Sequence, residues 1–202
     1  MQISNSEFTQ LGSQLILPLF EGTEKAPNNS LVGLSRSQRG LVKEALSSGE
    51  FDCKKGKRMT LWTPGCNIIL VGMGGRESFG HKRARDTGAR LIASMSKKKG
   101  LDVSVRFTFG WSGDRMIDFA EGIMLRNYEF LEHQETPEGH IGEPWEFDFQ
   151  ASKRHQVALS GGLKEVESVV AGVHLARDLG NEPANVLYPM EFARRAQEWG
   201  DD

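Results

Sequence analysis

Apolar residues along the chain fall into short runs that alternate with longer stretches of helical spacing. Strands are expected in one run before residue 14 and at residues 14–20, 59–62, 67–72, 102–109 and 156–159. The run at 67–72 is continuously apolar, which is typical of a strand buried on both faces. Pro18 cannot donate to a strand ladder, so its strand is expected to lie partly at a sheet edge.

The strand at residues 102–109 shows the clearest alternation. One set of side chains is apolar and the other polar, namely Val103, Val105, Phe107 and Phe109 against Ser104, Arg106 and Thr108. Successive side chains of a strand point to opposite faces, so the two sets are expected on opposite sides of the sheet.

Helical spacing appears in five stretches, at residues 37–47, 84–95, 114–130, 163–179 and 191–199. In the first, Leu41, Ala45 and Leu46 fall on one side, and Gly49 ends the helix. The second is expected to end at Gly100. Strands that alternate with helices predict an α/β domain, in which helices cover a mostly parallel or mixed sheet. Residues 132–144 hold two prolines and two glycines and are expected to form an exposed loop.

Composition excludes several classes of function. The chain has 202 residues and a net charge of −2, without the large positive field of a nucleic-acid-binding protein. Its longest apolar run, at residues 68–71, is far too short to cross a membrane. There is no signal peptide pattern, and the cysteines, Cys53 and Cys66, fit no metal or redox spacing. A reducing, cytoplasmic location is therefore expected.

The glycine-rich turn at residues 72–75 is the one place that resembles a phosphate-binding loop, because it joins a buried strand to a helix. A dinucleotide fingerprint would need glycine where Glu77 stands. A P-loop would need lysine at His81, and Lys82 comes one residue late. The sequence favours a tight structural turn here and leaves an anion or nucleotide site as the alternative.

Other candidate chemistry is sparse. No histidine pair has the spacing of a helical zinc site, although His133 and His140 lie in the acidic loop and could hold a metal weakly. His174 is expected at the surface or boundary of its helix. No nucleophile elbow is present, and Cys66 adjoins a buried strand as a small hydrophobe. We therefore predict no catalytic, metal-binding or cofactor-binding residue in this chain.

The segment at residues 177–189 resembles the linker signature of the leucyl aminopeptidase family. It reads Arg-Asp-Leu-Gly-Asn-Glu-Pro-Ala-Asn-Val-Leu-Tyr-Pro and matches at Asp178, Leu179, Asn181, Pro183, Asn185 and Pro189. Three upstream segments resemble family patterns in the same order, at residues 49–56, 69–74 and 121–130. One departure is Cys53, which stands where the family usually has glycine.

This resemblance implies a macro-domain-like mixed sheet flanked by helices on both faces, followed by a C-terminal linker helix. We expect the macro-like domain at residues 1–160, and the linker helix with the start of a connection to a catalytic domain at residues 161–202. The family's metal-binding segments, Lys-Gly-x-Thr-x-Asp and Asn-Thr-x-x-Glu-Gly-Arg, follow the linker and do not occur here.

The resemblance also implies a parent enzyme that releases N-terminal amino acids with two divalent metals, zinc or manganese. This chain would be its non-catalytic N-terminal domain, would pack on its own catalytic domain and would take part in hexamer contacts. No nucleic-acid or membrane partner is expected. The alternative is a standalone macro-like module that binds ADP-ribose or a related nucleotide.

Overall fold

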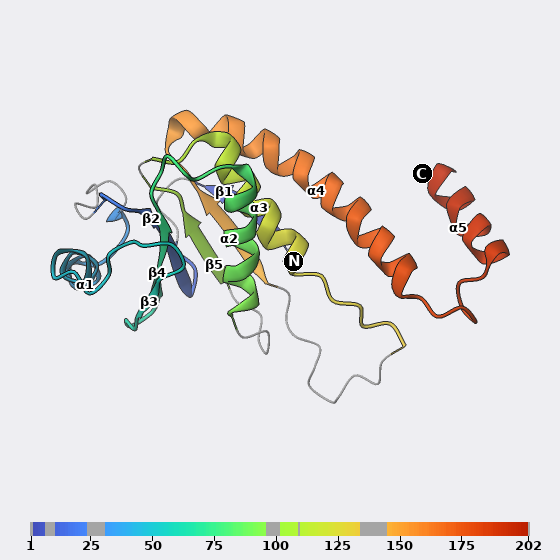
Figure 1. Cartoon of the computed structure of the whole chain (residues 1–202), viewed down its shortest axis with the longest axis horizontal. Coiled ribbons are helices and arrows are strands. Elements are labelled where there is room, and N and C mark those ends of the chain that lie inside the picture. Colours follow the sequence, from blue (N-terminus) through green and yellow to red (C-terminus); the bar gives the residue numbers. More distant parts are fainter. Residues whose placement is uncertain are drawn as a thin grey trace.

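The computed structural model describes residues 2–6, 11–23, 31–95, 102–108, 110–133 and 145–201, and its elements are shown in Figure 1. In chain order they are β1 (Gln2–Ser6), β2 (Gln14–Phe20), α1 (Arg36–Ser47), β3 (Arg58–Leu61), β4 (Asn67–Gly74), α2 (His81–Ala93), β5 (Asp102–Arg106), α3 (Gly113–Arg126), β6 (Glu146–Gln150), α4 (Lys153–Asn181) and α5 (Pro189–Asp201). Gly100, Phe109, His140 and most of the expected loop at 132–144 lie outside the described residues.

The strands form one mixed sheet in the order β1-β6-β5-β2-β4-β3. All neighbours are parallel except β3 and β4, which are antiparallel. The expected mixed α/β sheet is confirmed.

The partial edge expected from Pro18 is found only locally, because β2 as a whole lies between β5 and β4 in the middle of the sheet. The ladder from β2 to β5 runs only from Gln14 to Ile16, so Pro18 lies beyond it. Its carbonyl oxygen accepts hydrogen bonds from Trp111 Nε1 at 3.2 Å and Thr108 Oγ1 at 3.4 Å. The N–H that proline lacks would point to this same side, where no strand needs it.

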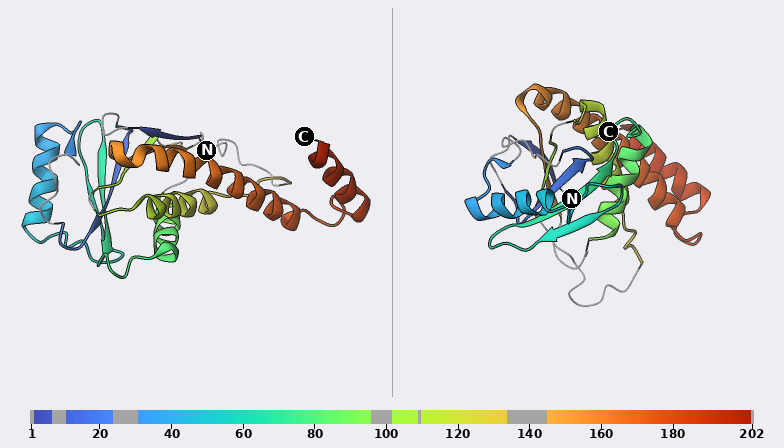
Figure 2. Two further views of the ribbon diagram at one scale, coloured as in Figure 1. Left: turned by 90° about the horizontal axis from the view of Figure 1, so that it is seen from above. Right: turned by 60° about the vertical axis from the view of Figure 1, so that its left-hand side comes forward.

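Helices cover both faces of the sheet. Figures 1 and 2 show α1 on one side and α2, α3 and the first half of α4 on the other. Strand β2 supplies both cores, since Leu15, Leu17 and Leu19 pack on the α1 side whereas Ile16 and Phe20 pack on the α3 side. This two-sided burial confirms the flanking helices expected from the resemblance.

The strand expected at residues 156–159 is wrong. These residues lie in the first turns of α4, and the last strand is β6, where Phe147 and Phe149 are buried. Leu159 is fully buried whereas Val157 is 86% exposed. Two residues that are two positions apart would share a face in a strand, so their different burial is typical of a helix. The expected division at 160/161 therefore falls inside a continuous helix and stays a prediction.

Helix α1 begins with a capping box, in which Ser35 accepts from the Gln38 backbone and the Gln38 side chain accepts from the Ser35 backbone. Its buried apolar residues are Val42, Ala45 and Leu46. Leu41 was expected on the same side but is 40% exposed. The apolar stripe of this helix is thus one position away from the expected one.

Strand β5 is buried on both faces, including the one expected to be polar. Ser104 and Arg106 do lie opposite Val103 and Val105, but both are buried. The Arg106 guanidinium donates to the carbonyl oxygen of Val32 at 2.6 Å and to Gln150 Oε1 at 2.8 Å. Burial lowers the pKa of Arg106 to about 10. The alternation of β5 was correctly predicted. The segment around Val32 that covers its polar face could not be predicted from the sequence.

Helices α2 and α3 cross in backbone contact. A Cβ atom on Gly122 would lie 2.0 Å from the carbonyl oxygen of Arg85, and one on Gly88 would lie 2.1 Å from that of Phe119. Only hydrogen fits at both positions, so the crossing distance depends on glycine.

Replacing Gly122 by alanine should lower the free energy of unfolding by about 2 kcal/mol, because the two helices must separate. Gly172 is the matched control, since its Cβ would meet nothing within 4 Å on α4. There Gly172→Ala should raise stability by about 0.5 to 1 kcal/mol through helix propensity. Urea unfolding of both variants checks the pair, and a neutral Gly122→Ala would refute the backbone contact.

Candidate functional site

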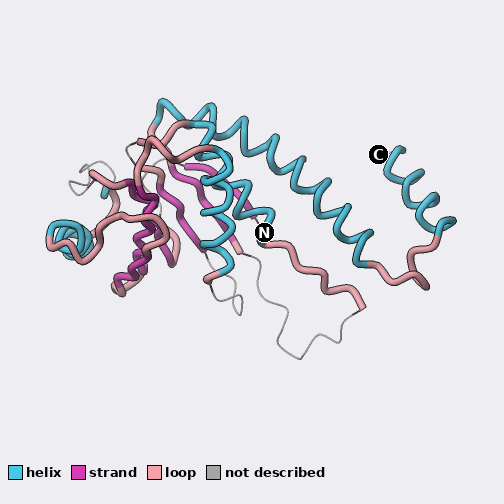
Figure 3. Tube along the Cα trace, viewed as in Figure 1, coloured by secondary structure: helices cyan, strands magenta, loops and turns pink. Residues whose placement is uncertain are grey.

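Helix α4 is far longer than the sheet it covers. Its 29 residues span about 43 Å at 1.5 Å per residue. Its buried residues, Leu159, Leu163, Val166 and Val170, all lie in the first 18 positions. Beyond them α4 extends past the sheet toward a short connection and α5, as Figures 1 and 3 show. The contacts that hold the far half of α4 therefore set the direction in which the chain continues beyond the sheet.

The far half of α4 is held at one polar junction with the end of α3. The hydroxyl of Tyr128 donates to Asp178 Oδ1 at 2.8 Å and accepts from Asn181 Nδ2 at 3.0 Å. Arg177 lies over the Tyr128 ring, with its guanidinium carbon 5.3 Å from the ring centroid. It also donates to the carbonyl oxygen of Leu125 at 2.7 Å, where α3 ends. We call these residues the linker junction.

The linker junction joins two segments that the sequence singled out separately. Leu125 and Tyr128 belong to the pattern at 121–130, whereas Arg177, Asp178 and Asn181 belong to the linker signature. The contact needs the phenol of Tyr128 on one side and the side chains of Asp178 and Asn181 on the other, whereas the Leu125 carbonyl that Arg177 binds is a backbone group.

The other two family segments also contact each other. The N–H of Gly72 donates to the carbonyl of Lys57, and the N–H of Gly74 donates to that of Cys53. A Cβ on Gly72 would lie 2.1 Å from the carbonyl oxygen of Lys54, so the two backbones touch. Cys53 adopts a left-handed φ of 54°, which accounts for glycine as the usual residue there.

Two N–H groups of the glycine-rich turn at 72–75 are therefore engaged by protein contacts. The N–H groups of Gly72 and Gly74 point to carbonyl oxygens of the segment at 53–57 and are not available to an anion. This geometry supports the structural interpretation of the turn over the nucleotide alternative.

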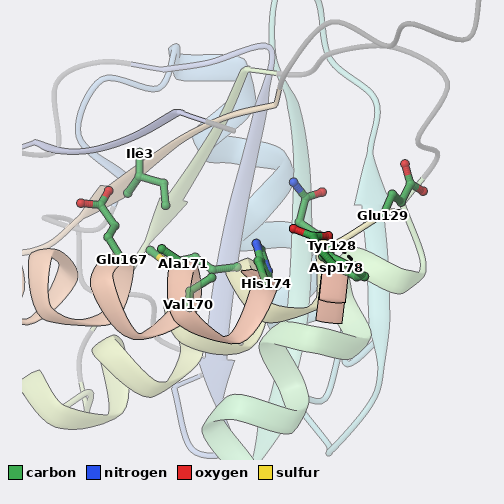
Figure 4. Close-up of a pocket in the computed structure, with 10 residues that line it drawn as sticks. Ile3, Tyr128, Glu129, Glu167, Val170, Ala171, His174 and Asp178 are labelled. Atoms are coloured by element: carbon green, nitrogen blue, oxygen red, sulfur yellow. Dashed lines mark hydrogen bonds between the residues drawn. The ribbon is translucent and has the colours of Figure 1, made fainter. Parts of the chain in front are cut away.

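A pocket of about 420 Å³ opens beside the linker junction, between β1, the end of α3 and α4 (Figure 4). Figure 4 shows His174 on α4 near Val170 and Ala171, and the Glu129 carboxylate pointing away from the other labelled side chains. Its lining consists of Ile3, Met124, Asn127, Tyr128, Glu129, Glu167, Val170, Ala171, His174 and Asp178.

His174 is half-buried, as expected for a boundary residue. Its ring centroid lies 5.2 Å from that of Tyr128, and its Nε2 is buried without a hydrogen-bond partner. Burial lowers the pKa of His174, and Arg177 adds to this effect, while Asp178 opposes it. The neutral imidazole is thus the form that fits the folded junction.

A second polar cluster lies where the chain passes from α4 to α5. His133 Nε2 is 2.8 Å from Glu182 Oε2, and Arg195 Nη1 is 3.2 Å from Glu182 Oε1. Glu132, His133 and Glu182 are the one group among the described residues whose ligand atoms could hold a metal ion. Both oxygens of Glu182 already face a basic partner, so the arrangement is satisfied as an ion-pair cluster.

Neither cysteine is placed as a nucleophile. Cys53 and Cys66 are both buried, and burial raises the pKa of the Cys66 thiol. Within the described ranges, no helix is long and apolar enough to cross a membrane.

Solved structures with a similar fold are peptidases and a related maturation enzyme. A tomato leucine aminopeptidase mutant matches with a TM-score of 0.68 and 24% identity, over 98% of this chain and 41% of that one. The bottromycin maturation enzyme BotP matches with a TM-score of 0.60 and 20% identity, over 92% of this chain and 36% of that one. The architecture is therefore of the kind found within aminopeptidases.

The chain belongs to the cytosol aminopeptidase family, because the model of that family's N-terminal domain matches residues 16–137. Among curated relatives, a probable cytosol aminopeptidase of Cyanothece sp. is 28% identical over 95% of this chain and 40% of that protein. One of Nitrobacter winogradskyi is 29% identical over 79% of this chain and 33% of that protein. The chain thus spans two fifths or less of the length of these relatives, and the expected family is confirmed.

Replacing Tyr128 by phenylalanine should loosen the far half of α4, because Asp178 and Asn181 lose their shared hydroxyl. Hydrogen exchange should then speed up at residues 171–181 and remain unchanged in the first turns of α4. Tyr188→Phe, at a half-exposed position in the linker, is the matched control and should leave both regions unchanged. Equal exchange in the two variants would contradict the junction's role.

The half-buried, neutral His174 predicts a loss of stability in acid. Its folded pKa lies below the ordinary value of 6.5, so the unfolded chain binds this proton first. Its contribution is complete above pH 6.5 and is lost as the pH falls below that value. His174→Gln should therefore show a smaller drop in unfolding free energy from pH 8 to pH 5 than the unchanged protein, measured by urea unfolding. Parallel pH curves would rule this out.

Proposed function

We propose that this chain is the non-catalytic N-terminal domain of a cytosolic, metal-dependent leucyl aminopeptidase. In this proposal the parent enzyme releases N-terminal amino acids from peptides, and two divalent metals, zinc or manganese, belong to a domain outside this chain. The chain's own contribution is to pack against the catalytic domain and to take part in hexamer assembly.

The observation that carries the proposal is the match of this chain to a third or two fifths of each longer aminopeptidase. The family's two metal-binding segments do not occur in the 202 residues, in agreement with that partial coverage. A structural neighbour, BotP, has been solved in complex with Mn, which favours a divalent metal in the parent enzyme.

The geometry of the C-terminal helices supports a docking role. Helix α5 has large apolar side chains on its surface, of which Phe192 and Trp199 lie on one side and are more than a third exposed, whereas the exposed Met190 lies on another side. Its polar side is organised separately, since Glu191 pairs with both Arg194 and Arg195 at 2.8 Å. A helix with one apolar and one ion-paired side is suited to packing against a further domain.

The linker junction would set the direction of this docking. It fixes the end of α4 to α3, and α4 continues through the Glu182 cluster to α5. In the parent enzyme, α4 would act as a rigid spacer between the sheet and the catalytic domain. The standalone ADP-ribose module is less well supported, because the glycine-turn N–H groups are engaged by carbonyls.

The native gene product should have an intact mass at least double the 22.5 kDa of this chain. Mass spectrometry of the protein isolated from its source cells measures this directly. A native mass of 22.5 kDa would contradict the proposal and make ligand binding or self-assembly the leading function. As a control for activity, the pure chain with manganese should not hydrolyse leucine amide.

A further inference from the structure

A second pocket, of about 400 Å³, lies along α2, and its lining shares no residue with the linker junction. It has no role in the proposed function. Its lining is rich in basic residues and consists of Lys55, Ser78, Gly80, His81, Lys82, Arg83, Asp86, Thr87 and Arg90. We call it the basic pocket.

Positive charge in the basic pocket exceeds what its single carboxylate can neutralise. Four side chains are cationic, and Asp86 is occupied by Lys82, whose Nζ lies 2.6 Å from Asp86 Oδ2. Neither Lys55 nor Arg90 forms an ion pair with a described residue. The charges of Lys55 and Arg90 are therefore available to an anion that enters the pocket.

Two of these cationic residues come from separate segments that both approach Gly74. A Cβ built on Gly74 would lie 2.5 Å from Arg83 Nη2 and 3.1 Å from Lys55 Cβ, so the Arg83 guanidinium lies close to the base of the Lys55 side chain. Arg83 is rigidly held, because it donates to the Met73 carbonyl and to Ser78 Oγ, each at 2.6 Å. A charge held in place in this way loses little conformational entropy when a ligand binds.

His81 is also oriented at the rim of the basic pocket. Its Nδ1 lies 2.7 Å from Asp118 Oδ2, and Arg85 holds the other oxygen of this carboxylate at 3.4 Å. The His81 side chain is 64% exposed, so its second nitrogen is accessible to solvent. A buried carboxylate that fixes an exposed imidazole gives the pocket one more directed polar group.

The start of α2 adds to the positive electrostatic potential of the basic pocket. Its first turn carries no acidic residue and its N-cap, Gly80, makes no side-chain hydrogen bond. Cations in a first turn oppose the helix dipole, and an anion placed there would offset both. This contribution supplements the side chains that form the pocket.

We propose that the basic pocket binds the phosphate group of a small phosphate ester. Phosphate suits a site where several cations from two segments converge, because it presents acceptor oxygens in several directions. The volume of about 400 Å³ also leaves room for a small organic group beside the phosphate. Lys55, Arg83 and Arg90 would contact the phosphate, with His81 at the rim and Asp118 as its positioning residue.

Isothermal titration of the chain with ribose 5-phosphate, inorganic phosphate and ribose tests this proposal. Ribose 5-phosphate should bind saturably, inorganic phosphate more weakly, and ribose not at all. The double variant Lys55→Gln/Arg90→Gln should weaken binding at least about tenfold, since it removes two charge-assisted contacts. The matched control is Arg39→Gln/Lys43→Gln on α1, which makes the same change in charge on the other face of the sheet.

Absence of saturable binding at millimolar ribose 5-phosphate would overturn the proposal. Equal weakening by the α1 control would also overturn it, because binding would then follow net charge alone. Binding of a single-stranded oligonucleotide but of neither small phosphate would assign the pocket to a polyanion instead. None of these outcomes affects the native mass of the gene product, so this proposal and the aminopeptidase proposal can fail separately.

Discussion

The central strand β2 is buried on both faces, and the arrangement of the other elements depends on this constraint. Its alternating side chains enter two separate cores, so an apolar layer is needed on each side of the sheet. Helix α1 supplies one layer. Helices α2, α3 and the start of α4 supply the other, and the close crossing of α2 and α3 at Gly122 brings both near the sheet.

The position of α4 follows from this second layer. The first half of α4 packs its apolar residues against the sheet and α3. Its second half extends beyond the sheet and is held by polar contacts. The hydroxyl of Tyr128 and the guanidinium of Arg177 replace the missing apolar burial with directed hydrogen bonds. A long helix held at both ends of its contact has a defined direction, which a flexible linker would not have.

The four segments that resemble the family's patterns are explained by two contacts. Residues 121–130 meet the linker signature at the linker junction, and residues 49–56 meet the end of β4 in a backbone contact at Gly72. Each contact constrains residues on both sides, because a hydrogen bond needs a donor and an acceptor and a close approach needs glycine. Cys53 shows the limit of that constraint, since a non-glycine residue takes up the left-handed conformation there.

The sequence by itself determined the fold class and most of the element types, because apolar periodicity and turn residues are local properties of the chain. The family followed from a resemblance of motifs, above all the linker signature at residues 177–189. Helix-like spacing predicted α1, α3 and α5 within a few residues, and alternation identified β5. Helix α2 was also expected, but it ends at Ala93 and not at Gly100. Only the tertiary structure decided the rest. The run at 156–159 is helical because only one of its sides has a packing partner. Pro18 is tolerated in a central strand because the β5 ladder ends before it. Arg106 is buried because it contacts Val32, which is 74 residues away in the sequence. The hydrogen bond between Tyr128 and Asp178 and the approach of Lys55 and Arg83 to Gly74 likewise join distant segments, and no local pattern encodes the distance between them.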